Sequence, residues 1–561
     1  MHPPHLRAIE LLRTLMRQTS PKQTLHRLLI STLALTSLTL MACSNGETRV
    51  ESGNRDGIFH VENSAEPQSI DPHVSTGVPE NNIILALFEG LVSKDPADLT
   101  PVPGIAERWE ISEDGKTYLF YIRENARWSD GEPITAHDYV WSWSRSLNPQ
   151  MANEYAYMLF PLKNAEPYAT GKMDNFDEVG VHAISDRILK VELENPTDYF
   201  LQLLDHHSTY AVPKHTILKY GSKTDRFSNW TRPGNMVSSG PFRLKEWDIY
   251  KVLKVEKNPY YWDKDTVSLN EIHFYPIENF STAERMFRVG QVHKTFEIPL
   301  NKVDVYRKEN PETLRNEPYI GTYYYQFNVT KPPFDDVRVR RALSLAIDRE
   351  AINHSVMFGV VEPAYTLTPP GASGYEPPKL ISFDPEEARR LLAEAGYPNG
   401  EGFPEVELLY NTNESHRKIA VAVQQMWNEN LNLNIQLLNQ EWKVYLASRN
   451  NLDYDIARAG WIGDIVNPIN FLDLGLSSNG NNRSGYNNPA YDELILKTIP
   501  ESATKEERLA NFAKAEEIIL NEMPFVPIYT YKTKYLLDPS VKGLTPNFMD
   551  YYSYKHVTLG N

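Results

Sequence analysis

The sequence predicts an α/β protein built from more than one domain, and three observations support that prediction. Strand-like runs of alternating apolar and polar residues are interleaved with helix-like runs along the chain. The chain has 561 residues, which is longer than a single hydrophobic core usually supports. No Pro- or Gly-rich linker marks a boundary, so we expect interrupted domains, with the chain crossing between them more than once.

The individual strands and helices are predicted from period and capping. Three segments alternate in the way of half-buried strands: residues 117–123, 187–193 and 250–258. Residues 384–396 predict a helix, because Asp384 suits the N-cap, a Pro follows it and a Gly ends the run. A second helix is expected over residues 504–522, where Thr504 and Glu507 form a capping-box pattern.

Residues 1–42 are predicted to be a secretory signal peptide. Five basic side chains precede an apolar run at residues 28–42, and this run is shorter than the roughly 20 residues that a membrane span needs. The run ends at Cys43, the only cysteine, in a context that resembles the lipobox of bacterial lipoproteins. That resemblance implies lipidation of Cys43 and a membrane anchor; the alternative is an ordinary signal peptide cleaved nearby, which leaves a free thiol.

The segment that follows is polar, and the rest of the chain is acidic. Residues 43–57 are expected to form the lipidated cysteine and a tether, because they show no periodicity. Removing the leader, which has five basic and one acidic side chains, changes the formal net charge from −16 to about −20. An acidic body argues against a nucleic-acid partner. With no second cysteine, its stability must come from its core and not from an internal disulfide.

The sequence contains no motif of the common catalytic or cofactor sites. The G-x-S-x-G, phosphate-loop, H-E-x-x-H and C-x-x-C patterns are all absent. His206 and His207 are adjacent, which puts them on opposite faces of a strand or about 100° apart on a helix, and neither arrangement favours joint metal binding. We therefore expect no enzyme, no cofactor and no metal, and we favour a binding protein.

One stretch, residues 453–468, points to where binding occurs. A strand-like run contains Arg458 and Trp461 and is followed directly by Asp464. One interpretation is a strand that ends in a turn, since Gly and Asp are common turn residues. The other is the edge of a pocket, where the carboxylate of Asp464 binds a cation.

Long segments of the chain resemble the peptide-binding subunits of ABC importers. They are residues 65–92, 103–143 and 322–350, together with "LLYNTNESHRKIAVAVQQMW", "NQEWKVYLASR" and "ARAGWIGD". The family is solute-binding protein family 5, and the group that the chain resembles most is the periplasmic oligopeptide-binding proteins. The resemblance covers almost everything after residue 57.

The resemblance implies a two-lobed periplasmic-binding-protein fold (type II, cluster C) with an extra inserted domain and a ligand enclosed between the lobes. It also implies an oligopeptide ligand, the transmembrane permease subunits of an ABC transporter as partners, and a location in the periplasmic space of the bacterial cell envelope. We expect a monomer. The implied boundaries are residues 58–88, 215–320 and 532–561 for lobe I, 89–214 for inserted domain II and 321–531 for lobe III, with a hinge near 320 and 531.

In this family the acid of a G-W-x-x-D motif receives the α-ammonium of the peptide, and the matching residue here is Asp464. A desolvated ammonium needs a nearby carboxylate, and such a charge-assisted contact is worth roughly 1.5–3 kcal/mol. Arg458 and His416 match residues that contact the C-terminal carboxylate of peptides of different lengths. Because Arg458 lies in a strand that enters the fold, we expect it to have an anionic partner.

Other positions match the walls of the cleft. The resemblance assigns Arg449, Trp442 and Leu446 to side-chain pockets, Tyr155 to the second lobe, Val78 to a backbone contact, and Trp461, Tyr319, Tyr324, Tyr531 and Glu297 to the lining. Two of these assignments have simple structural alternatives. The alternative for Trp442 is a core residue, and the alternative for His416 is a surface histidine beside Arg417 and Lys418.

The chain also departs from its relatives. Gly321 and Ile462 stand where enterobacterial relatives have two cysteines that form a disulfide. Met357 lies near the position of a lysine that meets short peptides, Thr76 replaces an acid and Glu297 replaces an amide. We therefore expect peptide backbone capture to be kept while the preferred length differs.

Three alternatives remain to the oligopeptide receptor. A specialised relative would bind murein peptide, a modified peptide or a metal chelate. An envelope chaperone or adhesin would bind unfolded protein without requiring a free N-terminus. A hydrolase would cleave a bound peptide.

Overall fold

The computed structural model describes residues 46–500, 502 and 504–560. The predicted signal peptide and Cys43 lie outside the described residues. The prediction that the tether extends to residue 57 is wrong, because helix α3 (Arg49–Asp56) forms there and buries Val50 and Gly53. Thr48 and Glu51 form a capping box that satisfies N–H groups at the start of this helix, which compensates for its polar sequence.

The first structural unit combines the start, the middle and the end of the chain. Its main sheet has the order β1-β10-β9-β8, in which β1 runs parallel to β10 and the other pairs are antiparallel. The strands are β1 (Ile58–Glu62), β8 (Phe242–Asp248), β9 (Val252–Lys257) and β10 (Glu271–Tyr275), with the short pairs β11 (Leu314–Arg315) with β18 (Tyr535–Leu536) and β19 (Val541–Lys542) with β20 (Thr558–Leu559). The helices besides α3 are α4 (Val78–Leu87), α9 (Phe280–Arg288) and α10 (Leu300–Glu309).

The second unit is an antiparallel sheet of order β4-β5-β7-β6 with helices packed against it. Its elements are β2 (Val92–Lys94), β3 (Pro101–Pro103), β4 (Ala106–Ile111), β5 (Thr117–Ile122), α5 (Ala136–Ser146), α6 (Ala165–Ala169), β6 (Val181–Ser185), β7 (Ile188–Glu192), α7 (Phe200–Leu203) and α8 (Lys214–Tyr220). Strands β5 and β7 confirm the strands predicted over 117–123 and 187–193. The third predicted strand, 250–258, is right only for β9, because a turn separates β8 from β9.

The third unit contains a six-stranded sheet of order β13-β17-β12-β16-β14-β15. Its strands are β12 (Pro318–Phe327), β13 (Glu362–Pro363), β14 (Glu407–Asn411), β15 (Gln436–Gln440), β16 (Ile456–Ile462) and β17 (Phe525–Lys532). Its helices are α11 (Val337–Leu345), α12 (Arg349–Ala351), α13 (Pro385–Glu394), α14 (Glu414–Leu431), α15 (Trp442–Asn450), α16 (Ile469–Leu472), α17 (Pro489–Glu493) and α18 (Lys505–Glu522). Helices α13 and α18 confirm the two predicted helices, with Asp384 and Thr504 as their N-caps.

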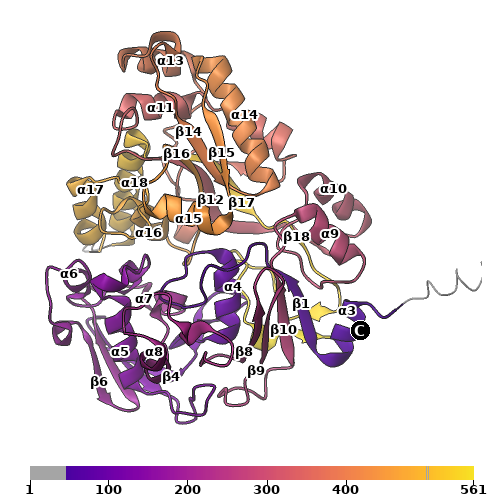
Figure 1. The fold of residues 1–561 in the computed structure, drawn as a ribbon. Helices are drawn as coiled ribbons and strands as arrows, with labels where there is room; N and C mark the ends of the chain where they lie inside the picture. Colours follow the sequence, from indigo (N-terminus) through magenta and orange to yellow (C-terminus); the bar gives the residue numbers. More distant parts are fainter. Residues whose placement is uncertain (1–45, 501, 503, 561) are drawn as a thin grey trace, which may run out of the picture.

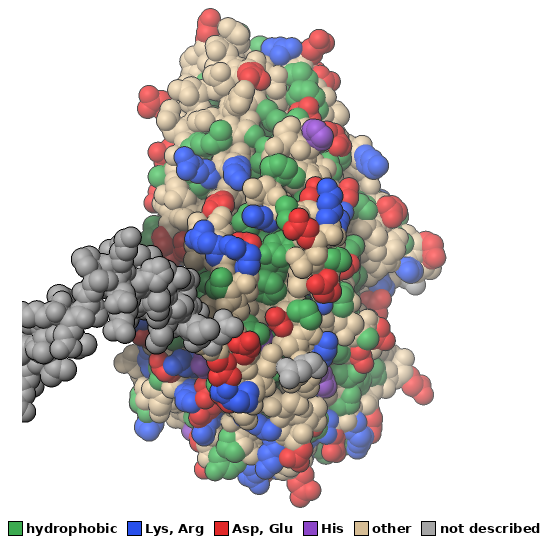
Figure 2. All heavy atoms as spheres, turned by 90° about the vertical axis from the view of Figure 1, so that its right-hand side faces the viewer, with side chains coloured by type: hydrophobic (Ala, Val, Ile, Leu, Met, Phe, Trp, Pro, Cys, Tyr) green, Lys and Arg blue, Asp and Glu red, His purple; other side chains and the backbone are tan. Residues whose placement is uncertain are grey.

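The third unit lies above the other two in Figure 1, and the yellow C-terminal segment returns to the indigo start of the chain. Strands β12 and β17 are hydrogen-bonded neighbours, and their ends at Pro318 and Lys532 lie at the two crossings expected to form the hinge. Over the face shown in Figure 2, acidic and basic side chains are interspersed. No helix in the described part of the chain is long and apolar enough to cross a bilayer.

Candidate ligand-binding site

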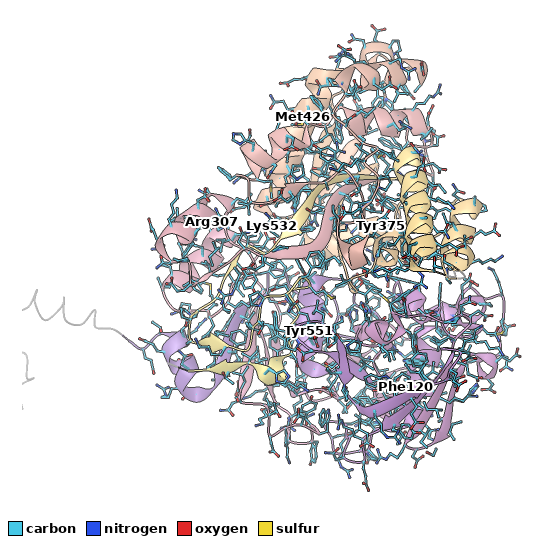
Figure 3. The ribbon with its side chains drawn as sticks, turned by 180° about the vertical axis from the view of Figure 1, so that it is seen from behind. Phe120, Arg307, Tyr375, Met426, Lys532 and Tyr551 are labelled. Atoms are coloured by element: carbon cyan, nitrogen blue, oxygen red, sulfur yellow. The ribbon has the colours of Figure 1, made fainter. Side chains whose placement is uncertain are left out.

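A cavity of about 310 Å³ lies where the three units meet. Its wall includes the start of α4, Tyr155 of the second unit and residues of β12, β16 and β17. Two residues of this wall, Lys532 of β17 and Tyr551 of the C-terminal segment, lie above and below the junction in Figure 3. All thirteen residues predicted to contact a ligand line it: Val78, Tyr155, Glu297, Tyr319, Tyr324, His416, Trp442, Leu446, Arg449, Arg458, Trp461, Asp464 and Tyr531.

Strand β16 presents a free edge along this cavity. It pairs with β12 from Ile456 to Ile462, whereas β14 pairs only with Ile456 and Ala457. The other edge of β16 from Arg458 onward therefore has no strand partner among the described strands. Unpaired backbone groups on a strand edge are a template for an added extended chain. This edge can accept the main chain of an elongated ligand.

Asp464 follows the free edge and has one carboxylate oxygen without a partner. Its N–H donates to Asn470 Oδ1 at 2.7 Å, and its main-chain oxygen accepts from Lys94 Nζ at 3.1 Å. Its Oδ1 lies 3.4 Å from His206 Nε2, whereas its buried Oδ2 has no hydrogen-bond partner. Asp464 therefore lies at a turn and also at the cavity wall; that its carboxylate binds a cation stays a prediction.

A buried charged cluster from the second unit supports this end of the cavity. Lys94 Nζ lies 3.2 Å from Asp205 Oδ2, with both side chains buried. Burial raises the pKa of the Asp205 carboxyl to about 6, and Lys94 opposes that rise. The His206 ring packs 4.4 Å from that of Tyr155, which in turn lies 5.9 Å from Trp461. The second unit thus contacts the third through this cluster.

Sequence reasoning missed Lys94 and Asp205 and considered His206 only as a metal ligand. His207 Nε2 donates to the Ser75 carbonyl at 3.0 Å, and burial lowers the pKa of His207 well below its usual range. Within the described residues, no group of three or more His, Cys, Asp or Glu is placed to hold a metal. The sequence signal that could have found them was the pair of adjacent histidines after Asp205. Only the fold shows that His206 lies beside Asp464.

Arg458 forms the opposite end of the free edge. Its Nη2 donates to Tyr531 Oη at 2.9 Å, its Nη1 to Asn411 Oδ1 at 3.3 Å, and its guanidinium lies 4.7 Å from the centre of the Tyr323 ring. The prediction of an anionic partner within the fold is wrong, since no carboxylate of the described chain lies within 4.0 Å of the Arg458 guanidinium. The strand holds the half-buried arginine beside tyrosines and leaves its charge available to a ligand.

His416 lies at the same end and is buried, so the surface alternative is wrong. Its Nδ1 has no partner, and its ring lies 5.5 Å from the Tyr323 ring. Burial, together with the nearby Arg458 charge, lowers the pKa of His416 well below its usual range. The imidazole is therefore neutral at physiological pH and can serve as a hydrogen-bonding group.

The remaining predicted residues differ in whether their polar groups already have partners within the protein. Trp442 and Leu446 lie on α15, where the Trp442 ring stacks 5.6 Å from Tyr445 and its Nε1 has no partner. Glu297 is already paired with buried Lys534 at 2.9 Å. Met357 is fully buried and is absent from the cavity wall. The lysine position inferred near Met357 therefore offers no ligand contact here.

These features define a class of protein. Three units enclose a cavity that has an acidic group at one end, a basic group at the other and a free strand edge between them. The six residue-to-residue steps of nearly extended chain from Arg458 to Asp464 span on the order of 20 Å. Such an arrangement suits a receptor that encloses an elongated ligand with oppositely charged ends.

The family follows from comparison with known proteins. The profile of "Bacterial extracellular solute-binding proteins, family 5 Middle" matches residues 100–483, and this chain belongs to that family. The chain is 40% identical over 492 residues to the periplasmic oligopeptide-binding protein OppA of Salmonella typhimurium, covering 86% of this chain and 89% of the relative. As a member of this family, it is a transport receptor and not an enzyme.

Solved structures share the fold. The Haemophilus influenzae OppA complex with RPPGFSPFR has a TM-score of 0.85 at 35% identity, covering 90% of this chain and 99% of that one. The Escherichia coli murein tripeptide binding protein MppA has a TM-score of 0.85 at 36% identity, covering 90% and 98%. The unliganded open form of MppA has a TM-score of only 0.60. The present arrangement of lobes therefore resembles a ligand complex more than an open form.

Proposed function

We propose that this protein is a periplasmic receptor that captures oligopeptides between its lobes and delivers them to the permease of an ABC importer. The observation that supports this most directly is the free edge of β16, which lies between the unpartnered Asp464 oxygen and an Arg458 guanidinium that donates to Tyr531 and has no carboxylate partner among the described residues. A peptide has a complementary arrangement: an ammonium, a hydrogen-bonding main chain and a carboxylate. The names of its relatives, oligopeptide-binding proteins, agree with this chemistry.

In this proposal the main chain and the two termini of the peptide supply most of the affinity. Asp464 receives the α-ammonium, and Arg458 or His416 receives the carboxylate, depending on peptide length. Tyr155, Trp461, Trp442 and the other lining residues form side-chain pockets in which water adapts to different ligands. Closing the lobes without a ligand leaves buried charges unpaired, so the peptide favours the closed state.

The chain is further proposed to be a lipoprotein. Its signal peptide would end at residue 42, and lipid on Cys43 would hold a monomer at the membrane, with residues 46–48 linking the anchor to α3. The lobe boundaries near residues 320 and 531 belong to the same proposal. Metabolic labelling with palmitate tests the anchor: we expect label in the wild type and none in Cys43→Ser. Label in both would show that Cys43 is not the lipidated residue.

Native mass spectrometry of residues 46–561, purified from a peptide-rich lysate, tests the ligand class. We expect a ladder of bound masses that correspond to short peptides. Titration with alanine peptides of two to six residues then gives the preferred length, and uniformly weak binding across that range would contradict the proposal.

A second candidate is a specialised receptor, which the similarity to a murein tripeptide binding protein supports. In that case one sharp bound mass, that of a cell-wall peptide or another single compound, would replace the ladder. Binding of unfolded protein without a free N-terminus would instead indicate a chaperone.

A further inference from the structure

Two arginines in the wall of the cavity have no acid to neutralise them. Arg449 of α15 is 5% exposed and Arg483 is 7% exposed. The Nε of Arg449 and both Nε and Nη2 of Arg483 are buried without a hydrogen-bond partner. Neither guanidinium lies within 4.0 Å of a carboxylate among the described residues. Burying a cation without an anion is costly, so these two charges require an explanation.

The surrounding protein holds the two arginines close together. Arg449 Nη2 donates to Gln326 Oε1 at 3.0 Å, and Gln326 Nε2 donates to the Arg483 carbonyl at 3.1 Å. Tyr454 Oη also donates to that carbonyl. Burial lowers the pKa of Arg483 from its ordinary value, and the charge of Arg449 lowers it further. The pair is thus held in place by neutral groups while its charges repel each other.

Glu154 acts on the pair electrostatically but does not neutralise it. Glu154 attracts Arg483, but its carboxylate lies 3.3 Å from Arg226 Nη2 and accepts from Asn450 Nδ2 at 3.3 Å. It is therefore shared with a separate arginine of the second unit. A free anion that entered the cavity would find two guanidiniums and no competing carboxylate bound to them.

This pair is distinct from Arg458. In the β12–β16 ladder Tyr325 lies opposite Arg458, whereas Tyr324 lies opposite Ala459, so these neighbours point to opposite faces of the sheet. Gln326, which bonds Arg449 Nη2 and the Arg483 carbonyl, is two residues from Tyr324 and therefore lies on the same face of β12 as Tyr324. Arg458 instead contacts Tyr531 and Tyr323. A strand added at the β16 edge directs alternate side chains to these two sides.

We propose that Arg449 and Arg483 form a subsite for a carboxylate carried by a side chain of the peptide, so that the receptor prefers peptides with an acidic residue at one position. The inference rests on the proposed function, because it needs a peptide main chain along β16. With its ammonium at Asp464 and its own carboxylate at Arg458 or His416, the ligand must supply the additional anion from a side chain. Planar guanidiniums bind carboxylates through paired hydrogen bonds, which suits Asp or Glu.

Calorimetric titration of the wild-type protein with tetra-alanine peptides tests the subsite. Each peptide carries a single Glu, Gln or Lys at one of the four positions. We expect one position at which Glu binds at least 10-fold more tightly than Gln, and Lys more weakly than Gln. If the peptides bind with no Glu preference at any position, the subsite is wrong and the peptide receptor stands. If none of the peptides binds, the proposed function itself fails.

A variant locates the preference. In Arg483→Met a similar volume is kept and the charge is removed, so the Glu-to-Gln ratio at that position should fall to within about 3-fold while the Gln peptide still binds. Arg390→Met, on the exposed face of α13, removes the same charge outside the cavity and should leave the ratio unchanged. A ratio that survives in Arg483→Met, or one that Arg390→Met also reduces, would overturn the assignment. If Arg483→Met does not fold, Arg483→Lys with the same peptides provides the comparison, since a point charge cannot form the paired contact and should reduce the ratio.

Discussion

The two ends of the β16 edge are built in different ways. Every group that touches Arg458 belongs to the third unit: Tyr531 of β17, Asn411 of β14 and Tyr323 of β12. The groups beside Asp464 include His206 and Lys94 of the second unit. The end proposed to bind the peptide carboxylate is therefore complete within the third unit, whereas the end proposed to bind the ammonium also needs residues of the second unit.

This difference suggests an order of events. A peptide can first meet the preformed edge of β16 and Arg458 in an open receptor. Its ammonium then neutralises Asp464 and allows the second unit, with its own buried Lys94–Asp205 pair, to close against it. A ligand shifts a conformational equilibrium only through a difference in affinity between the two states, and we expect that difference to lie at the Asp464 end.

The largest effect is expected from Asp464→Asn. The substitution keeps the shape and removes the charge that faces the ammonium, so the binding free energy of a free tetrapeptide should weaken by about 2–4 kcal/mol, measured by calorimetry. Because closure depends on this end, the variant with peptide bound should also remain more open in small-angle X-ray scattering. N-acetylated peptides provide the control, and wild-type protein that binds them as tightly as free peptides would show that Asp464 is not the anchor.

Arg458→Met should have a smaller effect on binding and leave closure intact. Loss of a charge-assisted hydrogen bond to the peptide carboxylate is expected to weaken binding by about 1.5–3 kcal/mol. Scattering from the peptide-saturated variant should match that of the closed wild type. C-terminally amidated peptides should bind both proteins alike, and an equal loss with amidated peptides would assign Arg458 a structural role.

His206→Gln should weaken binding least among the three cavity variants, by about 0.5–1 kcal/mol, because the 3.4 Å contact with Asp464 is long and the peptide ammonium takes over that carboxylate. His215→Gln is a matched control, since His215 lies in the same unit and pairs with Asp130 instead. An effect of His206→Gln as large as that of Asp464→Asn would mean that His206 itself binds the ligand.

Some residues of this site could be predicted from the sequence and others could not. The residues of β16 and Asp464 form one short motif, and the helix caps at Asp384 and Thr504 are local patterns, so the sequence predicts them directly. Lys94, Asp205 and Arg483 reach the cavity from loops and strands far apart in the chain, and their local sequence carries no binding pattern. The prediction of a tether up to residue 57 failed for a different reason. The capping box of Thr48 and Glu51 was present in the sequence and predicts α3.

The register of the sheet also explains one departure from relatives. Gly321 and Ile462, the positions expected to correspond to a disulfide elsewhere, are paired directly in the β12–β16 ladder. A Cβ at Gly321 would lie 2.6 Å from Ile462 Cδ1, so the isoleucine occupies the space that a side chain at 321 would need. The two positions are coupled by packing, which a sequence without the register does not reveal.

The last prediction concerns the pH dependence of stability at the Arg458 end, where His416 lies. Burial, together with Arg458, keeps the pKa of His416 well below its ordinary 6.5, so the folded protein leaves this histidine neutral where the unfolded chain protonates it. Stability therefore decreases as the pH falls below about 6.5, by at most about 1.4 kcal/mol per pH unit for this group. In urea denaturation at pH 7.5, 6.5 and 5.5, His416→Gln should lose less stability on acidification than the wild type does. His354→Gln, which changes an exposed histidine of the same unit, should follow the wild type. An unchanged slope in His416→Gln would show that the imidazole already carries a proton in the folded receptor, which would make it a second cation for the peptide carboxylate.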